Sequence, residues 1–279
     1  MTSRAAKPVL ITGCSSGIGR ATALRLAGSG YDVWATARNV DSLADLAAAG
    51  CVVRPLDVTD DTSARAVVDE ITAERGSVGG LVNNAGYGEY GPVEEVSIDR
   101  WRRQFETNVF GVVRMCQLVL PGMRQAGRGR IVMVSSMGGR MTLPGGGAYH
   151  ASKYALESLT DALRFEVRGF GVRVSLVEPG PVTTDFVDEA TTAGGEQGVY
   201  AEFGEAVARS NAAAYGGRRG TNTPDDIARV IQRALSASRP RPRYLVGVTA
   251  HGLVTARAAL GSRGFDAVLR TQLPTPSGR

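Results

Sequence analysis

The chain has 279 residues and a formal net charge of +5 at pH 7, with 43% hydrophobic and 21% charged residues. This size and composition are typical of one soluble globular domain, and no apolar run approaches the roughly 20 residues of a membrane-spanning helix. The first residues lead directly into an apolar strand, so we expect no signal peptide and a cytoplasmic protein.

Cysteine and histidine are scarce, which disfavours disulfides, metal sites and histidine-based catalysis. Cys14, Cys51 and Cys116 are an odd number and lie far apart in apolar surroundings. This pattern indicates buried free thiols and disfavours a disulfide or a metal site. Only two histidines are present, His150 and His251, which argues against a histidine metal centre and against a Ser-His-Asp triad.

The C-terminal segment is strongly basic. From Arg218 to the end, eleven arginines oppose three aspartates, so this segment carries a net charge of +8. A basic tail can serve nucleic acid or an anionic membrane surface. No nucleic-acid motif accompanies it, so we interpret it as a solvated arginine-rich surface and expect no nucleic-acid partner.

Short apolar segments alternate with helical patterns from residue 7 to about residue 180. The expected strands are 7–13, 31–38, 51–58, 79–86, 128–136 and 172–180, and the expected helices are 17–30, 61–76, 99–123 and 148–171. The strands show little polar alternation, so we expect a parallel sheet with both faces covered by helices. This predicts a single-domain α/β protein with a Rossmann-type doubly wound sheet over residues 1–279.

Residues 186–223 break the alternation, because they are small, polar and glycine-rich. We interpret them as an irregular substrate lid or loop. A helix over 223–237 follows, with Thr223 as its N-cap before Pro224. Residues 240–279 are predicted to form a C-terminal extension with a final strand at 241–247 and one or two short helices.

A glycine-rich turn, TGCSSGIG at 12–19, separates the first expected strand from the first helix. Its glycines, Gly13, Gly17 and Gly19, do not follow the usual dinucleotide spacing G-x-G-x-x-G. The physical demand is the same, because the backbone must turn sharply, approach a pyrophosphate closely and aim helix N–H groups at it. Ser15 and Ser16 add hydroxyl donors. The alternative is a strand-to-helix turn without a ligand.

The end of the second strand favours NADP(H) over NAD. A carboxylate there binds the ribose 2′-hydroxyl of NAD, whereas an arginine accommodates the 2′-phosphate of NADP. The sequence has Ala37 and Arg38 at this point, and Asp32 lies at the opposite end of the strand. Alternatively, Arg38 is only a surface charge. Asp57, after the third strand, either binds the adenine amino group or caps a helix.

Tyr149 and Lys153 are spaced i, i+4 and therefore share one face of a helix. A free tyrosine has a pKa of about 10 and is a poor base at neutral pH. An adjacent ammonium group stabilises the phenolate and lowers that pKa, so the tyrosine can exchange a proton with an alcohol or a carbonyl oxygen. The alternative is an ordinary exposed tyrosine–lysine pair.

In combination, these motifs resemble those of the short-chain dehydrogenase/reductases. The matching segments, in the same order and spacing, are TGCSSGIG (12–19), NNAG (83–86), Asn108, Ser136, YHASK (149–153) and PGPVTT (179–184). The resemblance covers roughly residues 7–185. It implies an oxidoreductase that works as a homodimer or homotetramer, paired through the outer faces of helices 99–125 and 149–168. Burial of these faces within one subunit is the alternative.

The resemblance implies a catalytic role for four residues. Tyr149 is the acid/base, and Lys153 binds the nicotinamide ribose hydroxyls and lowers the tyrosine pKa. Ser136 hydrogen-bonds the substrate oxygen, with Ser135 as the choice if the register is shifted by one. Asn108 orders a water that links Lys153 to solvent.

The resemblance also assigns cofactor contacts. Residues 84–86 line the adenosine side, and Val182 and Thr184 meet the nicotinamide amide, with Thr183 as the alternative register. The residues expected to bind the cofactor are Gly13, Ser15, Ser16, Gly17, Ile18, Gly19, Arg38, Asp57, Val58, Asn84, Ala85, Gly86, Tyr149, Lys153, Val182 and Thr184.

Within the family, the sequence looks like the branch of estradiol-type hydroxysteroid and retinol dehydrogenases, which generally uses NADP(H). The resemblance therefore implies an NADP(H)-dependent enzyme that interconverts a hydrophobic secondary alcohol and its ketone or aldehyde. A steroid enzyme and a bacterial-type relative that acts on another hydrophobic ketone are both open. The candidates for an apolar substrate lining, each of which also suits a protein core, are Tyr87, Met137, Leu143, Phe186 and Tyr200.

Two other functions stay open from the sequence. One is a non-catalytic NADP-binding sensor of the same fold, although a sensor has no need to keep the Asn-Ser-Tyr-Lys set. The other is a nucleic-acid or membrane-surface role for the arginine-rich tail.

Overall fold

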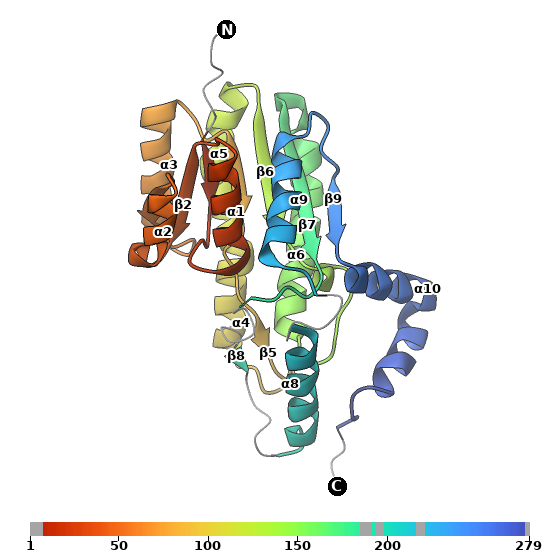
Figure 1. Ribbon diagram of the computed structural model, residues 1–279. Helices are drawn as coiled ribbons and strands as arrows, with labels where there is room; N and C mark the ends of the chain where they lie inside the picture. The colour runs from red at the N-terminus through yellow and green to blue at the C-terminus, as the bar shows by residue number, and fades with distance from the viewer. Residues whose placement is uncertain (1–7, 185–190, 193–197, 216–220, 277–279) are drawn as a thin grey trace.

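The protein is built around one parallel sheet of seven strands (Figure 1). The computed structural model describes residues 8–184, 191–192, 198–215 and 221–276. The strands lie in the order β3-β2-β1-β4-β6-β7-β9. Their bounds are Val9–Ile11 (β1), Val33–Ala37 (β2), Val52–Pro55 (β3), Gly80–Asn83 (β4), Gly129–Val134 (β6), Val172–Pro179 (β7) and Arg243–Val246 (β9). The strand order reverses between β1 and β4, where doubly wound folds bind ligands. The predicted fold class is confirmed.

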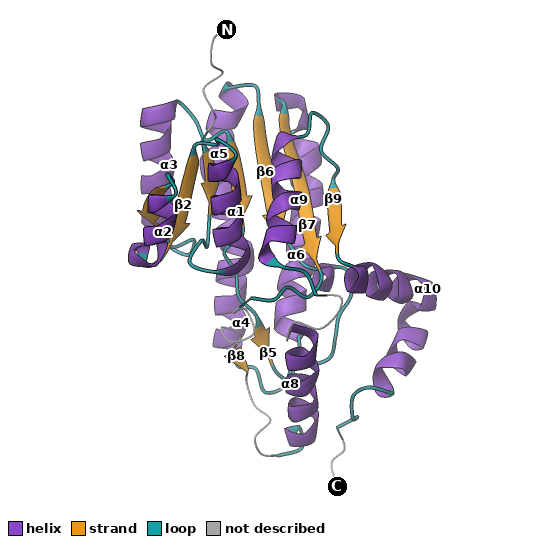
Figure 2. Ribbon diagram, in the orientation of Figure 1, coloured by secondary structure: helices purple, strands orange, loops and turns teal. Residues whose placement is uncertain are grey.

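Helices cover both faces of the sheet (Figure 2). One face packs on α1 (Gly17–Gly28), α2 (Ala44–Ala48) and α9 (Pro224–Ser236), and the other on α3 (Asp61–Arg75), α5 (Gly111–Gln125) and α6 (Gly147–Glu166). Along β1, Leu10 packs into the α3/α5/α6 core and Ile11 into the α1/α9 core. Both faces of the inner strands β1, β2, β4, β6 and β7 are therefore buried, which explains their continuous apolar sequence.

The helix expected over 99–123 is interrupted. The structure has α4 (Ile98–Phe105), a π-helical turn over Glu106–Phe110, and then α5. The extra residue of a π turn changes the direction of the side chains it carries, and such turns are frequent at functional sites. Here the turn carries Asn108. A periodicity argument cannot detect one inserted residue, because the apolar spacing on either side is preserved.

The prediction that 186–223 is irregular was wrong for its central part. The segment contains a 15-residue helix, α8 (Ala201–Tyr215), and a short strand, β8 (Thr191–Thr192), which pairs with β5 (Glu89–Tyr90). Alanine is the strongest helix former, and α8 is rich in it. Ala206 and Val207 anchor the helix by burial. The expected lining residue Phe186 lies outside the described residues.

The C-terminal predictions hold. Thr223 caps α9 in a reciprocal capping box with Asp226, and Pro224 is the first helical residue. After β9, α10 (Val248–Arg270) breaks at Gly261, so it forms two helical pieces. Its buried side packs Phe265 and its neighbours on Met137 and Met141.

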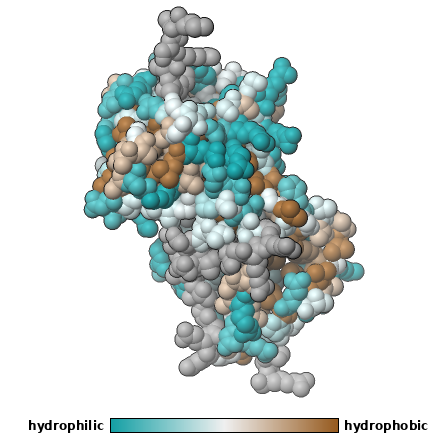
Figure 3. Space-filling view, in the orientation of Figure 1, coloured by the Kyte–Doolittle hydropathy of each residue, from teal (hydrophilic) through white to brown (hydrophobic). Residues whose placement is uncertain are grey.

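On its outer side, α10 exposes apolar side chains, including Val248, Leu260 and Val268, in the region where Figure 3 shows hydrophobic atoms. This part of the chain is therefore not a purely charged surface. No helix in the described residues is long and apolar enough to cross a bilayer. The three cysteines are buried and free, as predicted.

Candidate active site

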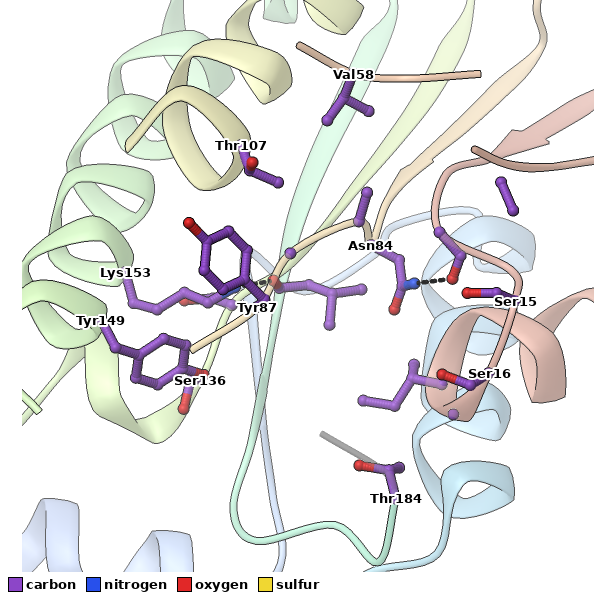
Figure 4. A pocket seen from close by; sticks show the side chains of 18 of the residues that line it. Ser15, Ser16, Val58, Asn84, Tyr87, Thr107, Ser136, Tyr149, Lys153 and Thr184 are labelled. Carbon is purple, nitrogen blue, oxygen red and sulfur yellow. Dashed lines mark hydrogen bonds between the residues drawn. The ribbon is translucent and has the colours of Figure 1, made fainter. Parts of the chain in front are cut away.

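A cleft of about 1050 Å³ lies at the carboxyl ends of the central strands (Figure 4). It extends from the glycine-rich turn after β1 to Tyr149 and Lys153 on α6. Of the residues predicted to act in catalysis or to bind the cofactor, all except Gly19 and Asn108 line it. Both exceptions lie directly behind the lining, and their contacts explain why these residue types are needed.

The glycine-rich turn is held so tightly that side chains cannot fit. Gly13 has φ +71°, and a Cβ atom there would lie 2.7 Å from the Cα of Ala85. A Cβ on Gly19 would overlap the carbonyl oxygen of Gly13 and lie 2.5 Å from Asn84 Nδ2. The first turn of α1 therefore packs directly on the preceding loop, which aims the helix N–H groups into the cleft.

Asn84 and Thr12 fix this turn to β4. Asn84 Nδ2 donates to the carbonyl oxygens of Thr12 (3.0 Å) and Gly13 (2.8 Å). The hydroxyl of Thr12 accepts the backbone N–H groups of Asn84 and Ala85, each at 3.1 Å. Thr12 was not predicted as a site residue. Its signal in the sequence is a hydroxyl side chain at the end of an otherwise apolar strand.

Arg38 and Asp57 follow β2 and β3 and line the cleft on the side of the glycine-rich turn that faces away from β4 and β6. Arg38 is exposed, and no ion pair joins it to another described residue. Asp57 Oδ1 accepts from the backbone N–H (2.9 Å) and the hydroxyl (2.7 Å) of Thr59. Asp57 therefore shapes the turn after β3, whereas Asp60 is the N-cap of α3. Arg103 of α4, which the sequence did not single out, lines the same cleft.

Tyr149 and Lys153 are buried side by side. Their exposed fractions are 6% and 7%, and Lys153 Nζ lies 5.8 Å from the centroid of the Tyr149 ring. The amine donates to the carbonyl oxygen of Val134 at 3.1 Å. Burial lowers the pKa of Lys153 to about 8, and the nearby carboxylate of Glu157 opposes that shift. The alternative of an ordinary exposed pair is excluded.

The local geometry distinguishes Ser136 from Ser135 and Thr184 from Thr183. Ser136 lies beside Tyr149 in Figure 4, and its Oγ accepts the N–H of Gly138 at 3.0 Å. Ser135 instead points its hydroxyl at Glu157, to which it donates at 2.5 Å. Thr184 lines the cleft, whereas Thr183 is exposed and outside the lining. Ser135, Ser136 and Thr184 all line the cleft, and the hydroxyl of Ser135 is engaged by Glu157. The roles of Ser136 and Thr184 stay predictions.

Asn108 lies beneath the site and is 1% exposed. Its Nδ2 donates to the carbonyl oxygen of Tyr87 (3.0 Å) and to Ser152 Oγ (3.1 Å), and its Oδ1 accepts from the N–H of Tyr87 (3.2 Å). Ser152 in turn donates to the carbonyl oxygen of Tyr149 at 2.7 Å. The π turn therefore ties the segment after β4 to the helix of Tyr149 and Lys153. No sequence signal marked Ser152 apart from its place within the Tyr/Lys motif.

The residues predicted to form an apolar substrate lining do not lie together in the structure. Tyr87 lines the cleft. Met137 and Leu143 belong to the cluster under α10 and do not line the cleft. Tyr200 donates to Glu94 at 2.7 Å near the surface. Tyr90, which was not predicted, packs its ring 5.7 Å from that of Tyr149.

Comparison with known proteins identifies the family. The model for the short chain dehydrogenase family matches residues 7–194. The chain belongs to this family. It is 37% identical over 270 residues to the uncharacterized oxidoreductase YbbO of Escherichia coli, covering 95% of this chain and 94% of that protein.

The hydroxysteroid and retinol branch is also confirmed. Human 17-beta-hydroxysteroid dehydrogenase type 1 is 35% identical over 288 residues, covering 97% of this chain and 82% of that protein. Human retinol dehydrogenase 8 is 42% identical over 192 residues, covering 65% of this chain and 61% of that protein.

Solved structures agree with the fold. A short-chain dehydrogenase from Streptomyces avermitilis has a TM-score of 0.82 and 35% identity, over 96% of this chain and 99% of its own. A Burkholderia phymatum family member in complex with NAD has a TM-score of 0.80 and 27% identity, over 100% and 99% of the chains. An alcohol dehydrogenase from Thermococcus sibiricus, complexed with 5-hydroxy-NADP, has a TM-score of 0.71 and 26% identity, over 88% and 97%. Similar proteins thus bind either nucleotide, and the chain is an oxidoreductase with a nucleotide cofactor.

Proposed function

We propose that this protein is an NADP(H)-dependent oxidoreductase that interconverts a hydrophobic alcohol and the corresponding carbonyl compound, with Tyr149 as the acid/base. The observation that carries the proposal is the buried pair of Tyr149 and Lys153 in the wall of the nucleotide cleft, with Ser136 beside the tyrosine. A tyrosine and an amine placed together in this way are suited to proton transfer at a substrate oxygen.

Each of the three residues has a distinct task. Ser136 Oγ accepts the N–H of Gly138, so its own proton is directed to the substrate oxygen. Tyr149 donates its hydroxyl proton to that oxygen during reduction and takes a proton from the alcohol during oxidation. The charge of Lys153 stabilises the Tyr149 phenolate. The nicotinamide group, when bound, supplies or accepts the hydride.

The cleft fits a dinucleotide. Its glycine-rich turn packs so closely that Gly13 and Gly19 have no room for side chains. Gly13, Ser16 and Gly17 line the cleft at the start of α1, where helix N–H groups are suited to a pyrophosphate. We assign Asp57 and Val58 to the adenine and residues 84–86 to the adenosine. Lys153 is assigned to the nicotinamide ribose, and Val182 and Thr184 to the nicotinamide amide.

Arg38 supports NADP(H) as the preferred form. It is exposed at the mouth of the cleft, and no ion pair to a described residue occupies its guanidinium group. No carboxylate stands at the end of β2 to bind a ribose 2′-hydroxyl. A guanidinium group is well suited to a phosphate, which it binds in a bidentate, charge-assisted manner.

A substrate panel tests the proposal. Steroids, retinoids, aliphatic ketones and polyketide-like carbonyls are offered with NADPH and with NADH, and the loss of nicotinamide absorbance is followed. We expect turnover of apolar carbonyls and a higher kcat/KM for NADPH. A preference for NADH contradicts the assignment of Arg38. Cofactor binding without turnover across the panel favours a non-catalytic sensor.

We further propose that the enzyme is a homo-oligomer paired through the outer faces of α5 and α6. Phe110, just before α5, and Phe165, near the end of α6, are 53% and 84% exposed. Large exposed aromatic side chains are typical of protein interfaces. Light scattering coupled to size exclusion measures the mass, and a monomer at micromolar concentration contradicts this proposal.

A further inference from the structure

A buried carboxylate lies one helical turn beyond Lys153. Glu157 is at position i+4 on α6, so both side chains leave the same face of the helix. Both reach the end of β6: Lys153 Nζ donates to the carbonyl oxygen of Val134, and Glu157 Oε1 accepts from the hydroxyl of Ser135. The amine and the carboxylate are therefore anchored on successive residues, immediately before Ser136.

Glu157 belongs to an ionic cluster that joins α6 to three other segments of the fold. Arg243 of β9 forms ion pairs with Glu157 (3.0 Å), with Glu178 at the end of β7 (3.1 Å) and with Asp161 of α6 (2.8 Å). Arg140, which follows the 3-10 turn Met137–Gly139, pairs with Glu178 at 3.1 Å. Arg164 completes the cluster and forms an ion pair with the same Asp161 at 2.7 Å.

The two innermost carboxylates of the cluster are its most buried members. Glu178 is fully buried and Glu157 is 6% exposed, whereas Asp161 has a side chain that is 46% exposed. If the charge of Glu157 is removed, Glu178 is the only buried carboxylate left in this cluster of described residues. The cost of holding a cation without a partner is large in such surroundings.

The charge of Glu157 affects the ionisation of Lys153. Burial raises the pKa of Glu157 to about 7, and the hydrogen bond from Ser135 opposes this rise. Burial lowers the pKa of Lys153 to about 8, and the charge of Glu157 opposes this fall. The pKa values of the two groups, about 7 and about 8, therefore lie close together.

We propose that Glu157 is a positioning residue for Lys153: its carboxylate, held by Ser135 and Arg243, supplies the negative charge that keeps the Lys153 amine protonated beside Tyr149. The catalytic consequence rests on the proposed function, because it requires that Lys153 act on Tyr149. The effect of Glu157 on the charge of Lys153 does not depend on the proposed function.

The composition of the chain makes Lys153 directly observable. Lysine occurs only at positions 7 and 153. The full-length protein labelled with ¹³C at lysine Cε gives two lysine signals, and the variant Lys7→Arg identifies the one from Lys153. The pH titration of that signal reports the protonation of the amine without any need for turnover.

Glu157→Gln is the decisive variant, because glutamine has nearly the same shape and can still accept the hydrogen bond from Ser135. We expect the Lys153 titration midpoint, about 8 in the unaltered protein, to fall by at least about half a pH unit. Asp161→Asn is the matched control. It removes a partner of the same Arg243 from the same helix but leaves Glu157 in place, so the midpoint should stay within about 0.2 units.

Ser135→Ala provides an independent test if Glu157→Gln fails to fold. Without the hydroxyl donor, less of Glu157 is ionised at a given pH, so the midpoint of Lys153 falls in the same direction by a smaller amount. An unchanged midpoint in Glu157→Gln, or in Ser135→Ala where the former does not fold, overturns the inference. An equal fall in Asp161→Asn also overturns it, because the effect is then not specific to Glu157.

The outcomes separate this inference from the proposed function. A shifted midpoint together with no turnover on any substrate retains the role of Glu157 and rejects the proposed activity on apolar alcohols and carbonyl compounds. Turnover together with an unshifted Lys153 midpoint supports the proposed function and rejects the role of Glu157. If both hold, the pH profile of turnover differs between Glu157→Gln and the unaltered enzyme and not between Asp161→Asn and the unaltered enzyme.

Discussion

Replacing Gly19 by alanine tests whether the first turn of α1 packs on the glycine-rich loop as closely as the structure shows. The added Cβ overlaps the carbonyl oxygen of Gly13 and lies 2.5 Å from Asn84 Nδ2. Neither can move freely, because the oxygen is backbone and the amide is hydrogen-bonded to Thr12 and Gly13. Overpacking of this kind costs about 1–3 kcal/mol, and a clash with backbone belongs at the upper end.

Gly28, at the other end of α1, provides the control. A Cβ there meets nothing within 4 Å, and Gly28 is not among the glycines with positive φ. Alanine is the better helix former by about 0.5–1 kcal/mol, so Gly28→Ala should stabilise the protein slightly. The two variants of one helix should therefore differ by about 3.5–4 kcal/mol in the free energy of unfolding.

Denaturant unfolding followed by circular dichroism measures this difference, and NADPH fluorescence measures cofactor affinity in the same samples. We expect Gly19→Ala to lose both stability and at least about tenfold in affinity, since it displaces the helix N-terminus that faces the pyrophosphate. Equal stability of the two variants, with unchanged affinity, would refute the close packing on which the cofactor assignment depends.

Three further outcomes are expected. Arg38→Ser should lower the ratio of kcat/KM for NADPH to kcat/KM for NADH at least about tenfold. The control Arg65→Ser, on the exposed face of α3, should leave this ratio unchanged. The same ratio in both variants contradicts the assignment of Arg38. Thr223→Ala should reduce the free energy of unfolding by about 1 kcal/mol in a denaturant titration, because it breaks the capping box of α9; no loss means that the cap does not matter. Lys153→Met should stabilise the protein at pH 7 by roughly 1–3 kcal/mol while abolishing turnover. Burial holds the pKa of Lys153 at about 8 instead of 10.5. Between these two pH values the unfolded state binds more protons than the folded state, so the stability gained by Lys153→Met falls as the pH rises through this range. A gain in stability that grows with pH contradicts this.

Much of the fold was predictable because its signals are local. The apolar strands are buried on both faces, so their composition alone indicated a parallel sheet. The turn at Gly13 and Gly19 could be predicted because a backbone that turns beneath a helix leaves no room for Cβ atoms. Tyr149 and Lys153 could be paired because a helix fixes the relation of residues four apart.

The features that the sequence did not predict depend on contacts between distant segments or on one inserted residue. The π turn that carries Asn108 leaves the apolar spacing of its flanking helices intact. Helix α8 was hidden by the glycine-rich residues around it, although its own alanines favour a helix. The pairing of Ser135 with Glu157 joins residues 22 apart, and the hydrogen bonds from Asn84 to the glycine turn span about 70 residues. No local pattern specifies such contacts.

The most direct test of the central claim is the kcat of Tyr149→Phe with NADPH and the best apolar carbonyl of the panel. The variant removes one hydroxyl and leaves the ring packed against Tyr90, so the cleft keeps its shape. The account predicts a loss of about 10²–10⁴ in kcat with little change in the Kd of NADPH, as expected for loss of a general acid. A variant that binds NADPH normally and keeps near-normal turnover would contradict the assignment of Tyr149 as the proton donor.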